Sequence, residues 1–328
     1  MPKSIIGGWR AFSLLKQADI LTAQPVNTLL NFEGDPIEPE PETYFMNDTE
    51  VTGELLPTKS RLINRKLQGK HKSKAFPHVV GLFSSMAMGK DTVSGAGPYV
   101  HKIEIDKTVV ELPYRTMIEN DGFAQFVYRG IACSGFMLSG QRGGFVEFEA
   151  DLIGAAAEAT DATAKPARLD ESYLAYGEVN LTKGGTFNGT VVSGGTSIAA
   201  NLVDFKLGFK NGAKGTYLFN DPTGNVGQVR RGSKYEVEFE GSIEIEDQTH
   251  RAALLAGTEL VFDIPIVGGA SAKIQTVLPR VVYREAKKGV DDGILKISAK
   301  WGVMSDPTYG GIVMFITNTH TASYLAAA

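Results

Sequence analysis

Residues 235–246 read YEVEFEGSIEIE, a stretch in which apolar and acidic side chains alternate. Successive side chains of a β-strand point to opposite faces, so this stretch predicts a long strand with one buried face and one acidic face. Residues 146–152, VEFEADL, repeat the pattern in the earlier part of the chain. Two such strands, far apart in sequence, predict a mainly β protein.

Further strands are predicted where short apolar or alternating segments are bounded by Gly, Pro or Asn. They are expected at residues 49–56, 100–106, 123–128, 131–139, 174–182, 199–210, 259–266, 273–284, 293–303 and 311–320.

Two segments predict helices. Residues 77–88 place apolar side chains such as Val80 and Phe83 on one face and are followed by Gly89, a residue that commonly ends helices. Residues 248–256 follow Asp247, a natural N-cap, and precede Gly257.

Each expected helix follows a strand and precedes three or four more. We therefore expect two similar β-sandwich or open-barrel halves, each with one flanking α-helix. Residues 1–45 are expected to be an extended N-terminal arm without a core of its own, because their end, DPIEPEPE, is acidic and proline-rich. The first half then covers residues 46–155, a linker covers 156–171, and the second half covers 172–328.

Composition excludes several classes of protein. The 328 residues carry a formal net charge of −4, which argues against a protein that binds nucleic acid by neutralising phosphates over its whole surface. The single cysteine, Cys133, cannot form an internal disulfide. We find no secretory signal and no apolar segment long enough to span a membrane, so we expect a soluble protein made in the cytoplasm.

Catalytic patterns are scarce. The five histidines are scattered and have no ligand partners at zinc-site spacing. Gly89-Lys90 lacks the spacing of a phosphate loop, and Asp291-Asp292-Gly293 reads as a turn, since no further calcium ligands follow it. The acidic ladder of residues 236–246 fits a solvated strand face better than a pair of catalytic carboxylates. We expect no enzyme activity, no cofactor and no metal.

The sequence resembles the major tail tube proteins of bacteriophages with long non-contractile tails. The resemblance lies mainly in residues 76–154, and its segments are MAMG (86–89), YVHKI (99–103), YRGIACSGFMLSG (128–140) and GFVEFEADLIG (144–154). Arg231-Gly232, followed by the long acidic strand and a short helix, also fits that family.

The resemblance implies a structural protein of the virion tail whose subunits form closed rings. Such rings stack into a hollow tube, in which strands of neighbouring subunits form a continuous inner barrel. The partners that it implies are other copies of the chain, a tape-measure protein and transiting DNA in the lumen, and tail terminator and distal tail proteins. If the halves are duplicates, three chains make a ring with pseudo-sixfold symmetry; otherwise six chains are needed. We favour three.

Two sets of residues are predicted to serve assembly. Carboxylates opposite the apolar strand faces are expected to line the lumen, although the outside of the tube is the alternative: Glu147, Glu149, Asp151, Glu236, Glu238, Glu240, Glu244 and Glu246. Charged residues of the arm and of a basic run, read as a solvated or partner-facing loop, are expected to bridge rings: Glu33, Asp35, Glu38, Glu40, Glu42, Lys59, Arg61, Arg65, Lys66, Lys70, Lys72 and Lys74.

Two other classes remain open from the sequence. One is a carbohydrate-binding or depolymerising tail protein, and the other is a virion decoration or stopper protein.

Overall fold

The computed structural model describes residues 9–25, 29–31, 40–47, 60–120, 122, 124–161, 163–168, 170–217, 224–244, 249–291 and 294–327. Two α-helices occur in these residues, α1 (Pro77–Met88) and α2 (Thr249–Ala256). The earlier strands are β1 (Trp9–Ser13), β2 (Leu29–Asn31), β3 (Glu40–Asn47), β4 (Ser60–Lys74), β5 (Gly89–Ser94), β6 (Tyr99–Ile105), β7 (Arg115–Asn120), β8 (Gln125–Gln141), β9 (Val146–Gly154) and β10 (Ala156–Thr160).

The first four of the later strands are two residues long each, and the others are longer. They are β11 (Thr182–Lys183), β12 (Thr186–Phe187), β13 (Val192–Ser193), β14 (Thr196–Ser197), β15 (Leu202–Lys210), β16 (Lys214–Tyr217), β17 (Val226–Arg230), β18 (Glu236–Glu244), β19 (Leu260–Gly269), β20 (Ala272–Asp291), β21 (Ile294–Val303) and β22 (Val313–Asn318). The prediction of a mainly β protein is confirmed.

The same order of elements occurs twice along the chain. The first series is β1, β2, β3, β4, α1, β7, β8, β9 and β10, and the second is β11, β14, β15, β18, α2, β19, β20, β21 and β22. We refer to them as the first half (residues 9–160) and the second half (residues 182–318).

Corresponding strands of the two halves also pair alike, and always antiparallel. β1 pairs with β2 and β7, as β11 pairs with β14 and β19. β4 lies between β3 and β9, as β18 lies between β15 and β21. β8 pairs with β7, β9 and β10, as β20 pairs with β19, β21 and β22. The two halves therefore share one topology. The hairpin β5–β6 is added to the first, and β12–β13 and β16–β17 are added to the second.

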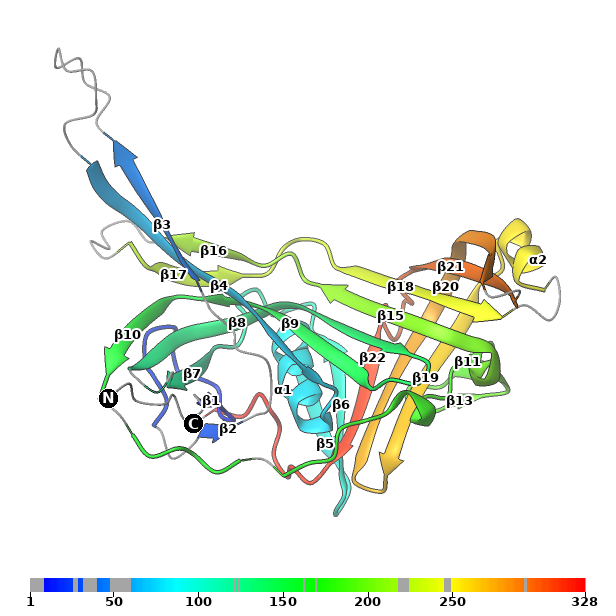
Figure 1. The fold of residues 1–328 in the computed structure, drawn as a ribbon, viewed down its shortest axis with the longest axis horizontal. Coiled ribbons are helices and arrows are strands. Elements are labelled where there is room, and N and C mark those ends of the chain that lie inside the picture. The colour runs from blue at the N-terminus through cyan, green and yellow to red at the C-terminus, as the bar shows by residue number, and fades with distance from the viewer. Residues whose placement is uncertain are drawn as a thin grey trace, which may run out of the picture.

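One sheet, which we call the long sheet, crosses both halves in the order β3-β4-β9-β8-β15-β18-β21-β20. The halves meet within it where β8 pairs with β15, from Gln141 opposite Asp204 to Gly135 opposite Lys210. The long sheet forms the upper layer in Figure 1, and α1 lies beneath it with β5, β6, β22 and the first part of β20. Both layers therefore contain strands from both halves.

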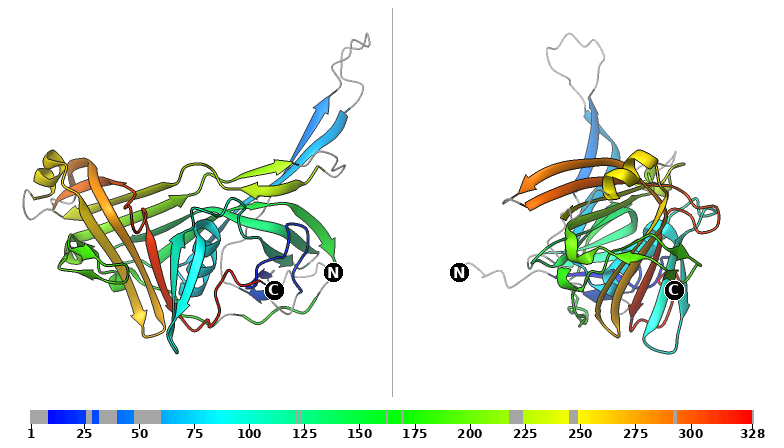
Figure 2. Two further views of the ribbon diagram at one scale, coloured as in Figure 1. Left: turned by 180° about the vertical axis from the view of Figure 1, so that it is seen from behind. Right: turned by 90° about the vertical axis from the view of Figure 1, so that its right-hand side faces the viewer.

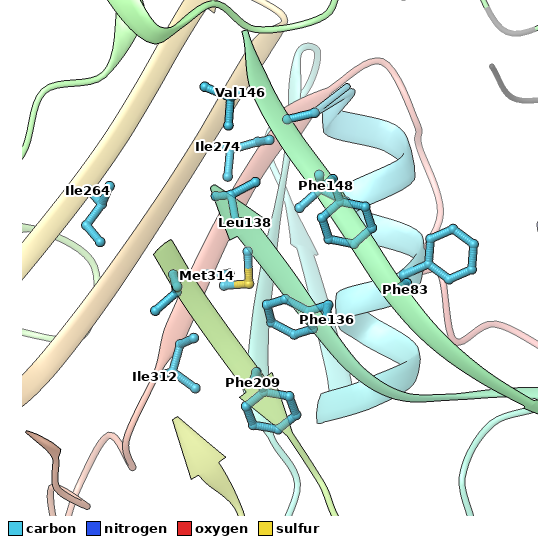
Figure 3. Close-up of a cluster of buried hydrophobic side chains, with 14 of the residues drawn as sticks. Phe83, Phe136, Leu138, Val146, Phe148, Phe209, Ile264, Ile274, Ile312 and Met314 are labelled. Carbon is cyan, nitrogen blue, oxygen red and sulfur yellow. The ribbon is translucent and has the colours of Figure 1, made fainter. Parts of the chain in front are cut away.

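Helix α1 is buried on every side between these layers. Pro77 occupies its first turn, and Gly89 ends it with φ 91°, a left-handed conformation that favours glycine. Phe83 of α1 packs edge-to-face on Phe12 of β1, with ring centroids 5.1 Å apart, and stacks on Phe148 of β9. Figure 3 shows Phe83, Phe148 and other large side chains of both halves in this core. A helix that is apolar all round needs such a position.

Helix α2 lies at the far end of the long sheet and is much less enclosed (Figures 1 and 2). Ala253 and Leu254 pack against the core, whereas the side chain of Leu255 is 78% exposed. Like α1, it is followed by a glycine with positive φ, Gly257 at 59°. The predictions of helices at 77–88 and 248–256 are thus confirmed to within one residue.

Several expectations need correction. Residues 9–13 of the predicted arm are packed against the body as β1, which pairs with β7 and whose Phe12 is 1% exposed. The basic run is not a loop: residues 60–74 form β4, and in its described second part the side chains of Lys70, Lys72 and Lys74 are exposed. The predicted linker begins with β10, which pairs with β8. Residues 174–182 form a 3₁₀ turn and loop rather than a long strand, and residues 49–56 lie outside the described part.

Candidate assembly surface

One face of the long sheet carries the charged side chains, and we call it the charged face. Its lysines are Lys70, Lys72, Lys74, Lys206, Lys210, Lys287, Lys296 and Lys300. Its carboxylates are Glu147, Glu149, Asp151, Asp204, Glu236, Glu238, Glu240, Glu244 and Glu285. The opposite face buries the intervening apolar side chains, among them Phe148 and Phe239, each 1% exposed. The alternation read from the sequence therefore orients both carboxylate strands as predicted.

In the first half the carboxylates of β9 face the lysines of β4. Glu147, Glu149 and Asp151 lie opposite Lys74, Lys72 and Lys70, respectively. Lys70 Nζ donates to Glu149, and it lies 3.5 Å from Asp151 Oδ1.

These contacts shift both partners toward their charged forms. The hydrogen bond to Glu149 raises the pKa of Lys70. Burial alone raises the pKa of Glu149, but the hydrogen bond and charge of Lys70, helped by Lys72, outweigh it and leave the pKa lowered. Glu149 and Asp151 are thus locally neutralised.

In the second half the carboxylates of β18 lie between two basic strands. Glu236 and Glu240 lie opposite Lys210 and Lys206 of β15, and Lys300 of β21 lies on the other side of Glu240, with 2.8 Å between Nζ and Oε1. The hydrogen bond to Glu240 raises the pKa of Lys300. Glu244 is bound by Arg142 instead, and Glu246 lies outside the described residues. The carboxylates therefore do not form a uniformly acidic face, because the sheet places a basic strand beside each acidic one.

The lysines of β15 and β21 are the functional candidates that sequence reasoning missed. Their signal is present in the alternation of Lys206 and Lys210 with the buried Leu207 and Phe209. The residues that lie beside a strand in the sheet cannot be predicted from the sequence of that strand. The acidic strands alone therefore do not indicate the charge of the whole face.

The residues predicted to bridge rings fall into three groups. Lys70, Lys72 and Lys74 belong to the charged face. Glu40 and Glu42 of β3 pair in the same chain with β4, opposite Gln68 and Lys66, and Arg61 and Arg65 lie farther along the same hairpin. Glu33, Asp35, Glu38 and Lys59 lie outside the described residues. The acidic and basic segments thus meet within one chain.

The β3–β4 hairpin extends past the body of the protein, as Figures 1 and 2 show. Pairing of β4 with β9 ends at Leu67, and Ser60–Lys66 continue beyond it with β3 as partner. At ~3.3 Å per residue this overhang is roughly 20 Å long. It is long enough to reach a neighbouring molecule along the strand direction.

The long sheet is open, with β3 as its terminal strand at one end and β20 at the other. From Val281 to Asp291, β20 has β21 on one side. Terminal strands present backbone groups to which another strand can pair. The two ends of this sheet are therefore candidate contact sites for other chains.

Metal and membrane sites find no support in the described part of the chain. No group of three or more His, Cys, Asp or Glu side chains there could hold a metal ion. Neither helix described above is long and apolar enough to cross a bilayer.

The family model described as phage tail tube protein matches residues 10–311, which include the β8–β15 pairing and all of both halves except Trp9 and residues 312–318, where β22 lies. No curated protein matches the chain.

Proposed function

Because the chain belongs to the phage tail tube protein family, which makes it a structural protein of the virion tail, we propose that it polymerises as stacked closed rings into the hollow tube through which DNA passes. Membership confirms the resemblance drawn from residues 76–154. The ring symmetry, the channel wall and the contacts between rings are parts of this proposal.

The observation that carries the proposal is the repeated topology within one open sheet. A half that pairs edge to edge with its copy inside the chain can pair in the same way with a copy in another chain. Repetition of one heterologous contact closes into a ring when the rotation per step divides a full turn. Closure also removes the terminal strands that otherwise invite aggregation. Three chains, each with two equivalent halves, therefore supply the six half-to-half contacts of a closed ring.

The charged face is the surface that we assign to the channel. Its opposite face is filled by α1 and the second layer, so only the charged face can meet bulk water in the interior of a ring of long sheets. DNA is gripped chiefly by Lys and Arg. The pairing of Lys70, Lys72 and Lys300 with carboxylates leaves no continuous positive track along this wall.

Contacts along the tube are assigned to the overhanging β3–β4 hairpin, which we propose reaches the adjacent ring. Tape-measure protein and DNA in the lumen, and terminator and distal tail proteins at the two ends, are the other partners of this proposal. We expect no catalytic activity, since a tube subunit acts through its surfaces.

Electron microscopy and native mass measurement of the purified chain test the proposal. We expect hollow tubes, and smaller species of three times the chain mass of 35.3 kDa. Rings of six chains would contradict the trimer but keep the tube. A chain that stays monomeric over a wide range of concentration, or one that releases sugar from capsule polysaccharide, would contradict the proposal itself.

A further inference from the structure

The joint between the two halves buries specific residues of the first half. Phe136 of β8 is 3% exposed and stacks on Phe209 of β15, with ring centroids 5.3 Å apart. Ala87 of α1 is fully buried, and its carbonyl oxygen accepts a hydrogen bond of 3.0 Å from Asn211 Nδ2, just after β15. β15 and the residue that follows it thus cover the end of α1 and the edge of β8.

Shared landmarks give the counterparts of these residues in the second half. Both helices end at a glycine with positive φ, Gly89 and Gly257, so Ala87 corresponds to Leu255. Pairing with the next strand is irregular between Cys133 and Gly135 in β8, and between Tyr283 and Glu285 in β20. Counting from these irregularities, Phe136 corresponds to Ala286.

At the end of the second half the same positions are uncovered. Leu255 is 78% exposed where Ala87 is fully buried. Leu295 is 40% exposed, whereas its counterpart in β9, Val146, is fully buried. Ala286 is only partly buried. An apolar surface on α2, β20 and β21 is therefore open where its equivalent in the first half is closed.

The strand that closes the first half also has a counterpart. Aligning the pairing register of β4 with that of β18 makes Glu40 of β3 the counterpart of Gly208 of β15. Counting along the two strands from this pair, Pro41 and Thr43 are the counterparts of Phe209 and Asn211.

The transferred register places one pair of opposite charges and one pair of like charges across the contact, the like pair being Glu42 of the partner subunit opposite Glu285, the counterparts of Lys210 and Gly135. In the joint within the chain, Gly208 lies opposite Met137, whose counterpart in β20 is Lys287. The same register between chains places Glu40 of the partner subunit opposite Lys287, whose side chain is 78% exposed. Opposite charges at directly opposed positions stabilise antiparallel strands.

We propose that the open end of the second half, formed by α2, β20 and β21, binds β3 of a second copy of this chain, in the antiparallel register by which β8 binds β15. Leu255 is buried by that copy and lies near Thr43 of the partner subunit. The inference rests on the proposed assembly into rings and specifies the contact that closes them.

Substitution of Leu255 tests the contact. Because this side chain is exposed in the single chain, Leu255→Asp is expected to leave the thermal unfolding of the monomer unchanged and to raise the dissociation constant between chains by at least about tenfold, as for an interface hot spot. The matched control is Val191→Asp, at a 57% exposed valine in the turn of the separate β12–β13 hairpin, which takes no part in the proposed contact and is expected to assemble normally. Normal rings from Leu255→Asp would overturn the contact.

Cross-linking gives an independent measurement. Residue 43 belongs to β3 and residue 255 to α2, which lie at opposite sides of the molecule in Figure 1, so a short thiol cross-linker can join them only between chains. Thr43→Cys with Leu255→Cys is expected to give cross-linked trimers, while each single variant gives none. Cys133 is fully buried and does not compete. If rings form without this cross-link, the proposed contact is wrong but the proposed ring is not. If the wild-type chain forms no rings, the proposed function is wrong.

Discussion

Gly130 lies where β8 changes partners. Up to Ile131, β8 pairs with β7 and β10, and from Ala132 on it pairs with β9 and then β15. Its φ is 63°, and a Cβ atom there would lie 2.5 Å from Ile20 Cγ1 and 2.8 Å from Ala155 Cβ. The sequence predicts two strands, 123–128 and 131–139, because a glycine in an alternating pattern looks like a break, whereas it is a bend within one strand.

Replacement of this glycine is expected to be costly. Gly130→Ala combines a strained backbone with a steric clash and should lower the free energy of unfolding by about 2–4 kcal/mol. Gly143→Ala is the matched control, since its φ is also positive, at 84°, but nothing lies within 4 Å of the added Cβ; it should lose about 1 kcal/mol. Urea unfolding at equal protein concentration measures both. Equal losses would show that the close approach to Ile20 has no energetic effect.

Glu171 places a partly buried carboxyl group at the start of α1. Its oxygens accept the His78 backbone N–H at 2.9 and 3.2 Å. Burial raises the pKa of Glu171 to about 7, against the lowering effect of that hydrogen bond. His78 stays neutral nearby, because burial lowers its pKa to about 3, and the phenol of Tyr324 is the other titratable group that faces the carboxyl.

This raised pKa predicts a dependence of stability on pH. The unfolded carboxyl ionises from about pH 4.5, whereas the folded one keeps its proton to about pH 7, so stability falls as pH rises through this window. Glu171→Gln cannot ionise and should match the wild type at pH 5 but exceed it at pH 8 by roughly 1–3 kcal/mol. Asp170→Asn, at an exposed neighbour, should leave the pH profile of unfolding as in the wild type. A Glu171→Gln chain with the wild-type profile would refute the assignment.

Among the elements, the β3–β4 hairpin and the β16–β17 hairpin occupy corresponding places. Each joins the first two strands of its half in the long sheet, and both extend toward the same side in Figure 1. The first is the longer overhang, and β17 is held to the body, where Val229 N–H donates to Tyr114 Oη. A ring of three chains would carry six extensions of two kinds on one rim.

Shortening the longer hairpin tests its role between rings. Tyr44 lies opposite Asn64, so replacing residues 45–63 by an Asn-Gly turn keeps the remaining register. We expect rings of normal mass but few long tubes by electron microscopy. A Gly/Ser segment of equal length should fail in the same way if side-chain contacts matter, and tubes of normal length from the shortened chain would refute the assignment. Deleting residues 1–42 does not isolate this role, because it also removes the buried Phe12.

Local patterns predicted some elements well and others poorly, for physical reasons. Helix ends at Gly89 and Gly257, and the alternation in β9 and β18, are set by nearby residues and were predictable. β4 was not, because its alternating lysines resemble a basic loop until β9 supplies carboxylates beside them. The outward direction of Glu236 and Glu240 was predictable, but the sign of the surrounding surface was not, because it depends on strands brought together only by folding.

At the scale of the whole molecule, the charged face holds lysines and carboxylates in nearly equal numbers. Glu236, Glu238 and Glu240 of β18 supply one row of this balance. Exposed pairs contribute only ~0–1 kcal/mol each, so changing their charge should alter the potential of the wall far more than the stability of the fold.

Charge reversal in this row tests the channel assignment. Changing Glu236, Glu238 and Glu240 to Lys should leave tubes intact, slow DNA ejection and make binding of short duplex DNA to tubes strongly salt-dependent. The double variant Lys206→Glu with Lys210→Glu makes the adjacent strand more negative instead of more positive. Its tubes should not retain DNA. Ejection at the wild-type rate from the lysine variant would place this face outside the channel.

The pairing of β8 with β15 inside one chain has a consequence for how assembly begins. In the proposed ring, half of the six joints form when each chain folds, at an effective concentration set by the connecting segment rather than by the amount of protein in the cell. Nucleating a ring then takes encounters among three molecules instead of six, so the critical concentration depends less steeply on how much subunit is made. The two halves are also free to diverge, because the β5–β6 hairpin can change without the β16–β17 hairpin. A tube whose wall has pseudo-sixfold symmetry can then have a surface with threefold symmetry.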